Sequence, residues 1–278
     1  MFFKNVRKYP LNIAHRGARS VAPENTLLAA RKALEFGADA WEFDVQMSSD
    51  GIPVVIHDKT LSRTSDVCEI ESLSEKFPWL VHEFTLAELR MLNAGTWFIA
   101  QDPFAQIKSG SFSEKDLSDI AAQSVTTLEE ALIFSNSLKL KINIEIKDLS
   151  GLPGDADVVK KVLETVRILG MSDEVLISSF NYNYLRKIKD LASDISTAVL
   201  TDIPQSDPLG LLRELGAEAY HPAADAADAD TVSFLRKKGF YVNVWTVNDE
   251  NAMMKWIRAG VSGIFTDFPQ ILSKMLSS

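Results

Sequence analysis

Two carboxylates stand two positions apart in an alternating segment of the chain. Residues 40–47 read Ala-Trp-Glu-Phe-Asp-Val-Gln-Met, so Glu42 and Asp44 alternate with apolar side chains. Such alternation is typical of a β-strand, where side chains two positions apart point the same way. Two carboxylates in one pocket repel each other unless a proton or a cation intervenes, and a hard divalent ion bound by oxygen ligands meets that need. A solvent-facing strand surface is the alternative interpretation of a lone Glu-x-Asp pair.

The segment 141–147 repeats this pattern. Its isoleucines form one face, and Glu145 and Lys147 belong to the other. By itself this pair is equally typical of an exposed salt bridge at a strand end. On a strand beside that of Glu42 and Asp44, however, Glu145 completes a three-carboxylate metal site. Lys147 then adds a positive charge one step further along the strand.

His15 and His57 each end an apolar run, and Arg16 follows His15 directly. Because both imidazoles titrate near neutral pH, one can accept a proton while the other gives one. The guanidinium of Arg16 suits bidentate phosphate recognition. A lone histidine at a strand end is more often a structural hydrogen-bonding group. Trp245 also stands at the end of an apolar run, where an aromatic wall for a small polyol is one interpretation and core packing is the other.

These residues need a scaffold that brings strand ends together. Apolar runs of strand type alternate with helical patterns, which indicates parallel strands joined by crossover helices. Eight such units predict a (β/α)8 barrel, the TIM barrel, whose active site lies at the carboxyl ends of the strands. The predicted strands span residues 11–14, 40–47, 141–146, 175–178, 197–200, 218–220, 241–246 and 263–266. The predicted helices span residues 26–36, 127–135, 156–169, 182–191, 209–215, 229–238 and 248–259.

An open doubly wound sheet is the competing arrangement. It normally carries a glycine-rich phosphate loop after its first strand, whereas this chain has His-Arg-Gly-Ala-Arg there. A short strand over 53–56, joined to the second strand by a turn at Asp50-Gly51, predicts a hairpin. Residues from about 58 to 124 then break the alternation of strands and helices. We therefore expect one catalytic barrel domain over residues 1–278, with an insertion at about 58–124 after the second strand.

Composition restricts the class of protein further. With 278 residues and 46% hydrophobic content the chain can bury a large core, and its formal net charge of −9 argues against unspecific binding to nucleic acid or to an anionic membrane. The single cysteine, Cys68, excludes a disulfide within the chain. No apolar stretch has the length of a signal peptide or of a transmembrane helix. The expectation is a cytoplasmic protein without a stable membrane anchor.

Short motifs follow one another in a fixed order along nearly the whole chain, from about residue 12 to residue 269. They include His15-Arg16-Gly17, Pro23-Glu24-Asn25-Thr26, Glu42-Phe43-Asp44-Val45, Val55-Ile56-His57-Asp58, Arg63-Thr64, Glu145-Ile146-Lys147, Ser178-Ser179-Phe180, Val244-Trp245-Thr246-Val247-Asn248 and Thr266-Asp267-Phe268-Pro269. Together these motifs resemble the glycerophosphodiester phosphodiesterase family.

The resemblance implies a (β/α)8 barrel with a small insertion after the second strand. It implies hydrolysis of glycerophosphodiesters to sn-glycerol 3-phosphate and an alcohol, with one divalent cation, Ca²⁺ or Mg²⁺. By position, Glu42, Asp44 and Glu145 would be the metal ligands. The implied partner is a small-molecule substrate, and the oligomeric state stays open.

The resemblance also implies roles for the other candidate residues. His15 and His57 would be the acid–base pair. Arg16 and Lys147 would hold phosphate oxygens, and Trp245 would line the glycerol pocket. Which histidine is the acid and which is the base is left open.

Two other functions use the same residues. One is a phospholipase D-like hydrolysis of lysophospholipids, for which an exposed apolar rim would be needed. The segments Phe77-Pro78-Trp79-Leu80 and Trp97-Phe98 are candidates for such a rim. The other is a non-catalytic module that binds a glycerophosphodiester, against which the presence of both histidines and all three carboxylates argues.

Overall fold

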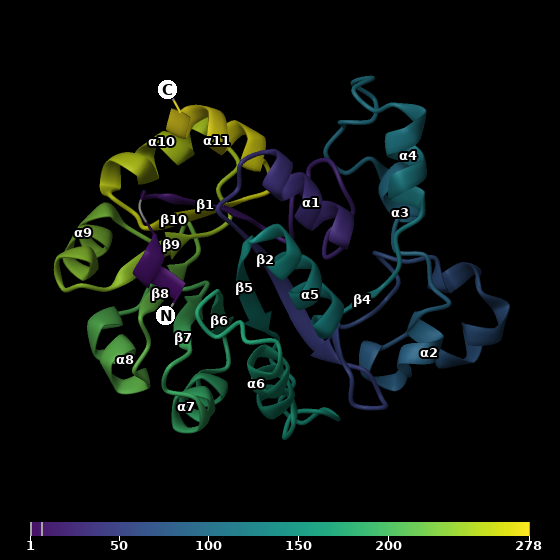
Figure 1. Cartoon of the computed structure of the whole chain (residues 1–278), viewed down its shortest axis with the longest axis horizontal. Coiled ribbons are helices and arrows are strands. Elements are labelled where there is room, and N and C mark those ends of the chain that lie inside the picture. Colours follow the sequence, from purple (N-terminus) through teal and green to yellow (C-terminus); the bar gives the residue numbers. More distant parts are fainter. Residues whose placement is uncertain (1, 7, 278) are drawn as a thin grey trace.

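Within the described residues, 2–6 and 8–277, eight strands form a closed ring in the computed structural model (Figure 1). They are β1 (Leu11–Ala14), β2 (Ala40–Met47), β5 (Lys141–Ile146), β6 (Val175–Ser179), β7 (Ser196–Thr201), β8 (Ala219–Pro222), β9 (Tyr241–Val244) and β10 (Gly263–Thr266). Their order is β1-β10-β9-β8-β7-β6-β5-β2, and pairing of β1 with β2 closes the ring. Every neighbouring pair in it is parallel. The predicted (β/α)8 barrel is confirmed, and the strand ends differ from the prediction by no more than two residues.

Helices cover the outside of the ring (Figure 1). They are α1 (Leu27–Glu35), α5 (Leu128–Leu138), α6 (Val158–Ile168), α7 (Tyr182–Leu191), α8 (Pro208–Leu215), α9 (Ala229–Lys237), α10 (Glu250–Ala259) and α11 (Pro269–Ser277). Helix α10 begins two residues later than predicted because the Asp249 side chain accepts the Ala252 N–H and caps it. Helix α11 was not predicted, although it begins at Pro269, a residue that suits the first helical turn. Among the described residues, no helix combines the length and the apolar character that a bilayer crossing requires.

The alternation along β2 separates two environments. Trp41, Phe43 and Val45 are buried in the apolar layer between the strands and the outer helices. Glu42 and Asp44 point the other way, into the barrel, where they are 3% and 1% exposed. A one-residue shift of this strand would exchange the two sets, so burial of the aromatic face fixes the inward position of the carboxylates.

A second apolar cluster fills the amino-terminal end of the barrel. It contains Phe2 and Phe3 from the short 3-10 helix η1 (Phe2–Asn5), together with Ile13 of β1 and Leu176 of β6. Phe3 stacks on Tyr241 with ring centroids 3.7 Å apart. This end of the ring is therefore packed with side chains, and the chemistry has to lie at the other end.

Residues 56–125 join two short strands that extend the sheet beside β2, and the later part of this segment lies beside α1 (Figure 1). Strand β3 (Pro53–Val55) pairs antiparallel with β2, and β4 (Thr126–Thr127) pairs antiparallel with β3. Between them are η2 (Val67–Glu69), η3 (Glu71–Lys76), η4 (Val81–Glu83), α2 (Leu86–Leu89), α3 (Thr96–Gln101) and α4 (Glu114–Ala121). One apolar cluster attaches this segment to the hairpin and another attaches it to α1. We propose to regard residues 58–124 as an insertion within one barrel domain.

Candidate active site

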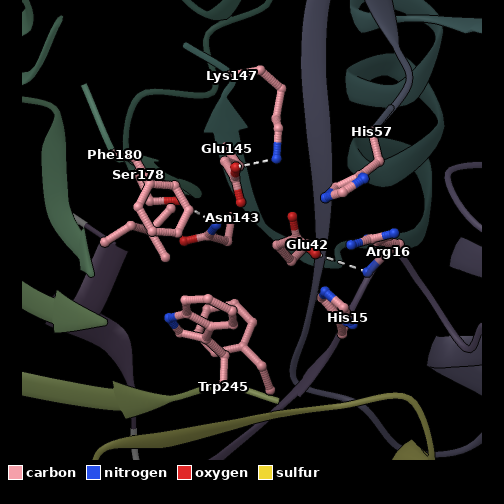
Figure 2. Close-up of a pocket in the computed structure, with 12 residues that line it drawn as sticks. His15, Arg16, Glu42, His57, Asn143, Glu145, Lys147, Ser178, Phe180 and Trp245 are labelled. Atoms are coloured by element: carbon pink, nitrogen blue, oxygen red, sulfur yellow. Dashed lines mark hydrogen bonds and ion pairs between the residues drawn. The ribbon is translucent and has the colours of Figure 1, made fainter. Parts of the chain in front are cut away.

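A cavity of about 200 Å³ lies at the carboxyl ends of the barrel strands (Figure 2). Polar and charged side chains line one side of it, and aromatic and aliphatic side chains line the other. Of the candidate site residues, the cavity is lined by His15, Arg16, Glu42, His57, Glu145, Lys147 and Trp245. Asp44 is 1% exposed, and its carboxylate oxygens lie 3.5 Å from Arg16 Nε and 3.4 Å from Lys147 Nζ. The barrel thus brings together side chains that are more than 200 positions apart in the sequence.

The three carboxylates meet because β2 and β5 are neighbours in the ring. Their register places Asp44 opposite Glu145 and Glu42 opposite Asn143. One oxygen from each of Glu42, Asp44 and Glu145 can be chosen so that all three lie within 4.8 Å of one another. A set of hard oxygen donors at this separation fits one divalent cation such as Ca²⁺ or Mg²⁺.

The electrostatics of the cluster point to the same need for positive charge. Burial, followed by the charges of Asp44 and Glu145, raises the pKa of Glu42 well above its usual value. Burial also raises the pKa of Glu145. At Asp44 burial is outweighed by Lys147 and Arg16, which lower the pKa of that carboxyl. Lys147 places its Nζ 2.6 Å from Glu145 Oε1 and 3.4 Å from Asp44 Oδ1. A bound cation would allow all three carboxyl groups to ionise.

His15 is held by a buried carboxylate. Its Nδ1 lies 2.7 Å from Asp267 Oδ1. The Asn248 side-chain amide donates to Asp267 Oδ2 at 2.7 Å, and the Asp267 backbone N–H donates to Asn248 Oδ1 at 2.9 Å. Burial lowers the pKa of His15 despite the neighbouring Asp267. Because Nδ1 contacts Asp267, Nε2 is the imidazole nitrogen that is available to a ligand in the cavity.

His57 has a matching arrangement on the opposite side of Arg16 (Figure 2). Its Nδ1 lies 2.6 Å from Asp58 Oδ1, and Arg63 donates to Asp58 Oδ2 at 2.5 Å. Arg63 also donates to both oxygens of Glu24, at 2.7 and 3.0 Å. Both histidines are therefore oriented through Nδ1 by an aspartate.

Glu24 connects the two sides of this network. It is 6% exposed, and it accepts from Arg16 Nη1 at 2.9 Å as well as from Arg63. Burial would raise the pKa of Glu24, but Arg63 and then Arg16 outweigh it and lower the pKa to about 2. The Arg16 backbone N–H donates to Glu42 Oε2 at 2.8 Å, so the same loop contacts the carboxylate cluster.

Asp267, Asp58, Glu24 and Arg63 were not among the predicted site residues. Each belongs to a motif that carried the resemblance, and Asp58 directly follows His57. That adjacency was the available signal for Asp58. For Asp267 the pairing joins residues 252 positions apart, which only the closed ring reveals.

The other side of the cavity is apolar. Trp245 and Phe180 form an edge-to-face pair with ring centroids 5.7 Å apart, and Leu200 and Phe265 lie beside them. The Trp245 indole N–H donates to the His221 carbonyl at 2.8 Å, which fixes the ring at the end of β9. An aromatic wall opposite a charged wall suits a small ligand with an anionic end and a carbon skeleton.

This fold and this cavity define a class of protein: a (β/α)8-barrel enzyme with an acidic cluster and two aspartate-bound histidines at its active face. Comparison with known proteins identifies the family. A model of the glycerophosphoryl diester phosphodiesterase family matches residues 15–271. The chain belongs to this family and is an enzyme of its kind, a phosphodiester hydrolase.

Individual relatives agree with this assignment. A glycerophosphodiester phosphodiesterase of Caldanaerobacter subterraneus is 33% identical, with 96% of this chain and 97% of that protein covered. One from Bacillus altitudinis is 34% identical, with 92% and 94% covered. Among solved structures, an Oleispira antarctica phosphodiesterase in complex with the product sn-glycerol-3-phosphate aligns with a TM-score of 0.80 and 29% identity, with 96% of each chain covered.

Proposed function

We propose that this enzyme hydrolyses glycerophosphodiesters to sn-glycerol 3-phosphate and an alcohol, with one divalent cation, Ca²⁺ or Mg²⁺. The observation that carries the proposal is the meeting of three carboxylates and two aspartate-bound histidines in one cavity. The product found in the Oleispira antarctica structure supports a ligand of this chemistry.

The carboxylates of Glu42, Asp44 and Glu145 would hold the cation, which when bound neutralises charge on the phosphate oxygens. Arg16 and Lys147 add two positive charges at the same cavity. Burial lowers the pKa of both side chains, whereas the surrounding carboxylates raise it. The effect of the carboxylates is larger, so both pKa values are raised. Both side chains therefore stay protonated and bind phosphate oxygens, while Trp245 packs against the glycerol unit.

His15 and His57 carry the protons. One imidazole accepts the proton of the attacking hydroxyl, from water or from the glycerol unit, as its oxygen forms a bond to phosphorus. The other donates a proton to the leaving alkoxide as the bond from phosphorus to that oxygen breaks. Attack by water gives glycerol phosphate directly. Attack by a glycerol hydroxyl gives a cyclic phosphate, which water then opens: one imidazole takes the proton of the water and the other returns a proton to the ring oxygen as its bond to phosphorus breaks. Replacing either histidine with alanine should lower the turnover of a glycerophosphodiester about 10²-fold or more.

Product analysis tests the proposal as a whole. The purified protein is incubated with a panel of glycerophosphodiesters in EDTA, and then with added Ca²⁺ or Mg²⁺. The expected result is release of sn-glycerol 3-phosphate that EDTA abolishes and a cation restores. Turnover that is unchanged in EDTA would overturn the role of the three carboxylates, and absence of turnover with every diester and cation would overturn the activity.

The lysophospholipid alternative loses part of its support. Trp97 and Phe98 are 8% and 1% exposed and pack against α1, so they do not form a lipid-facing rim. Phe77 is 72% exposed and contacts Trp79 edge to face, which leaves one aromatic pair for that role. Comparing glycerophosphocholine with lysophosphatidylcholine separates the two functions, and we expect the water-soluble diester to be preferred.

A further inference from the structure

The floor of the cavity carries a polar pair to which the catalytic proposal gives no role. Asn143 of β5 and Ser178 of β6 line the cavity and are 1% and 0% exposed. The Asn143 side-chain amide donates to Ser178 Oγ at 2.9 Å (Figure 2). The two side chains thus form one fixed unit on neighbouring strands.

This unit has hydrogen-bonding capacity left over. Asn143 Oδ1 is buried and has no hydrogen-bond partner among the described residues. Ser178 Oγ accepts from Asn143, which leaves its own O–H free to donate to another group. Burial of an unpaired donor and an unpaired acceptor costs stability, so their presence beside a cavity calls for a partner.

The surroundings restrict what that partner is. Trp245, Phe180 and Leu200 line the same cavity and give it an apolar surface. A carbonyl acceptor disfavours an anion, and the cationic groups Arg16 and Lys147 belong to the charged side. A neutral hydroxyl, of water or of an alcohol, can both donate to Asn143 Oδ1 and accept from Ser178. An alcohol hydroxyl also brings carbon atoms that can pack on the neighbouring apolar side chains.

Position along the strand connects this pair with the acidic cluster. Asn143 and Glu145 are two residues apart on β5, a rise of about 7 Å. A hydroxyl-bearing carbon unit of a few atoms, esterified to a phosphate beside Glu145, has about the length needed to reach Asn143. In that pose, phosphate contacts the charged side while carbon atoms contact Trp245.

We propose that Asn143 and Ser178 bind a hydroxyl of the glycerol unit and thereby select glycerol esters over other alkyl esters of phosphate. The proposal rests on the function proposed above and adds the group that the enzyme recognises. A site built to hydrogen-bond a substrate hydroxyl rejects an analogue without it, because the buried polar groups then stay unpaired.

The test compares kcat/KM for glycerophosphocholine with kcat/KM for two analogues, each lacking one of the two free glycerol hydroxyls. We expect the unmodified enzyme to prefer glycerophosphocholine over one analogue by about 10²-fold or more. In Asn143→Leu and in Ser178→Ala this preference should fall by at least about tenfold, through loss on glycerophosphocholine rather than gain on the analogue.

Matched variants control for loss of a buried polar group in the same barrel. Ser179→Ala removes the neighbouring hydroxyl, which donates to the Ile146 carbonyl instead of facing the cavity. Asn243→Leu removes a buried amide that contacts His221. Both controls should keep the preference for glycerophosphocholine, whatever their effect on the overall rate.

Equal kcat/KM for all three diesters would overturn the proposal while leaving the hydrolytic function intact. An equal fall of kcat/KM on all three diesters in both variants would overturn it as well. If Asn143→Leu does not fold, the result for Ser178→Ala decides. Absence of turnover would overturn the proposed function instead. In that case the hydroxyl site is tested by calorimetry, which compares the affinity for sn-glycerol 3-phosphate with the affinities for its deoxy analogues. Equal affinities would overturn the hydroxyl site.

Discussion

At the scale of single residues, the pairing of each histidine with an aspartate suits both side chains to the proton transfer proposed for them above. Asp267 accepts from Nδ1 of His15, and Asp58 does so for His57. A carboxylate on Nδ1 fixes the tautomer in which Nε2 can accept a proton, and it stabilises the imidazolium that results. In the proposed mechanism the two aspartates are therefore positioning residues, since they would act through the histidines.

Replacing Asp267 with asparagine should lower kcat about 10²- to 10⁴-fold with little change in KM. The amide can donate to Nδ1, which would stabilise the wrong tautomer of His15. Because Asp267 opposes the lowering of the His15 pKa by burial, its loss should lower that pKa further. The pH dependence of kcat/KM for the residual activity checks this, with its limb for His15 moving to lower pH.

Asp249→Asn is the matched control, because Asp249 caps α10 and contacts the Ala252 N–H. It should change neither kcat nor the pH profile, since asparagine also caps helices. A purely structural role of Asp267 would be indicated by a lower Tm together with an unchanged kcat per folded molecule.

Glu42→Gln should abolish most activity and yet stabilise the protein in EDTA. The pKa of Glu42 is raised in the folded chain, so its ionisation above the unfolded value of about 4.3 favours the unfolded state. A neutral amide removes this cost, and the gain should disappear below about pH 4, where the carboxyl is protonated in both states. Thermal unfolding of both proteins in EDTA at pH 4 and pH 8 measures this gain in stability. A lower Tm for the variant than for the unmodified protein at pH 8 would contradict the prediction.

At the scale of elements, the insertion reaches the active site through Asp58, at its start, and Arg63. Arg63 binds Asp58, which orients His57, and Glu24, which contacts Arg16. Its planar guanidinium serves two carboxylates at once, which a lysine ammonium does not reproduce. The insertion therefore holds two groups of the cavity in place without lining it.

Arg63→Lys should lower kcat about tenfold or more while leaving the barrel folded. Lysine keeps the charge but loses the contacts to both carboxylates, so His57 and Arg16 lose their fixed orientation. Steady-state kinetics, with circular dichroism for the fold, check this. Arg90→Lys is the control, since Arg90 bridges the insertion to Glu130 and the Val125 carbonyl away from the cavity. Equal kinetics of the two variants would argue against the role of Arg63.

The sequence predicted the strands better than it predicted their partners. Alternation alone identified residues 40–47 as a strand and the inward side of Glu42, because an aromatic face can be buried in one register only. Contacts such as that of His15 with Asp267 depend on ring closure between β1 and β10, which carries no local signal. The unpaired Oδ1 of Asn143 could not be predicted from the sequence either. It is unpaired because no neighbouring group among the described residues of the folded barrel donates to it.

At the scale of the whole molecule, the acidic cluster exists only in the folded chain, where β2 and β5 pair. Its ligands come from β2 and β5, whose positions in the sequence lie about 100 residues apart. A cation that needs all three carboxylates therefore binds the folded chain in preference to the unfolded one. Binding of this kind adds about 2.7 kcal/mol of stability when the free cation is at 100 times its Kd.

Ca²⁺ or Mg²⁺ should accordingly raise the Tm of the protein above its value in EDTA. The rise should be absent in Glu145→Gln, which removes one ligand of the cluster. Thermal scans at matched ionic strength, with NaCl as the control salt, separate specific binding from screening. A Tm that does not respond to either cation at millimolar concentration would contradict the site.

The packing of Phe2 and Phe3 into the amino-terminal end of the barrel bears on the order of product release. With that end filled, substrate enters and products leave through the carboxyl-end mouth. In the binding mode proposed above, the glycerol unit rests on the floor of the cavity, so the alcohol is the outer part of the diester and departs first. The glycerol phosphate follows and, while bound, excludes the next substrate molecule. Product inhibition should therefore be competitive with substrate for glycerol phosphate, and turnover in a cell would respond to the reaction that consumes it.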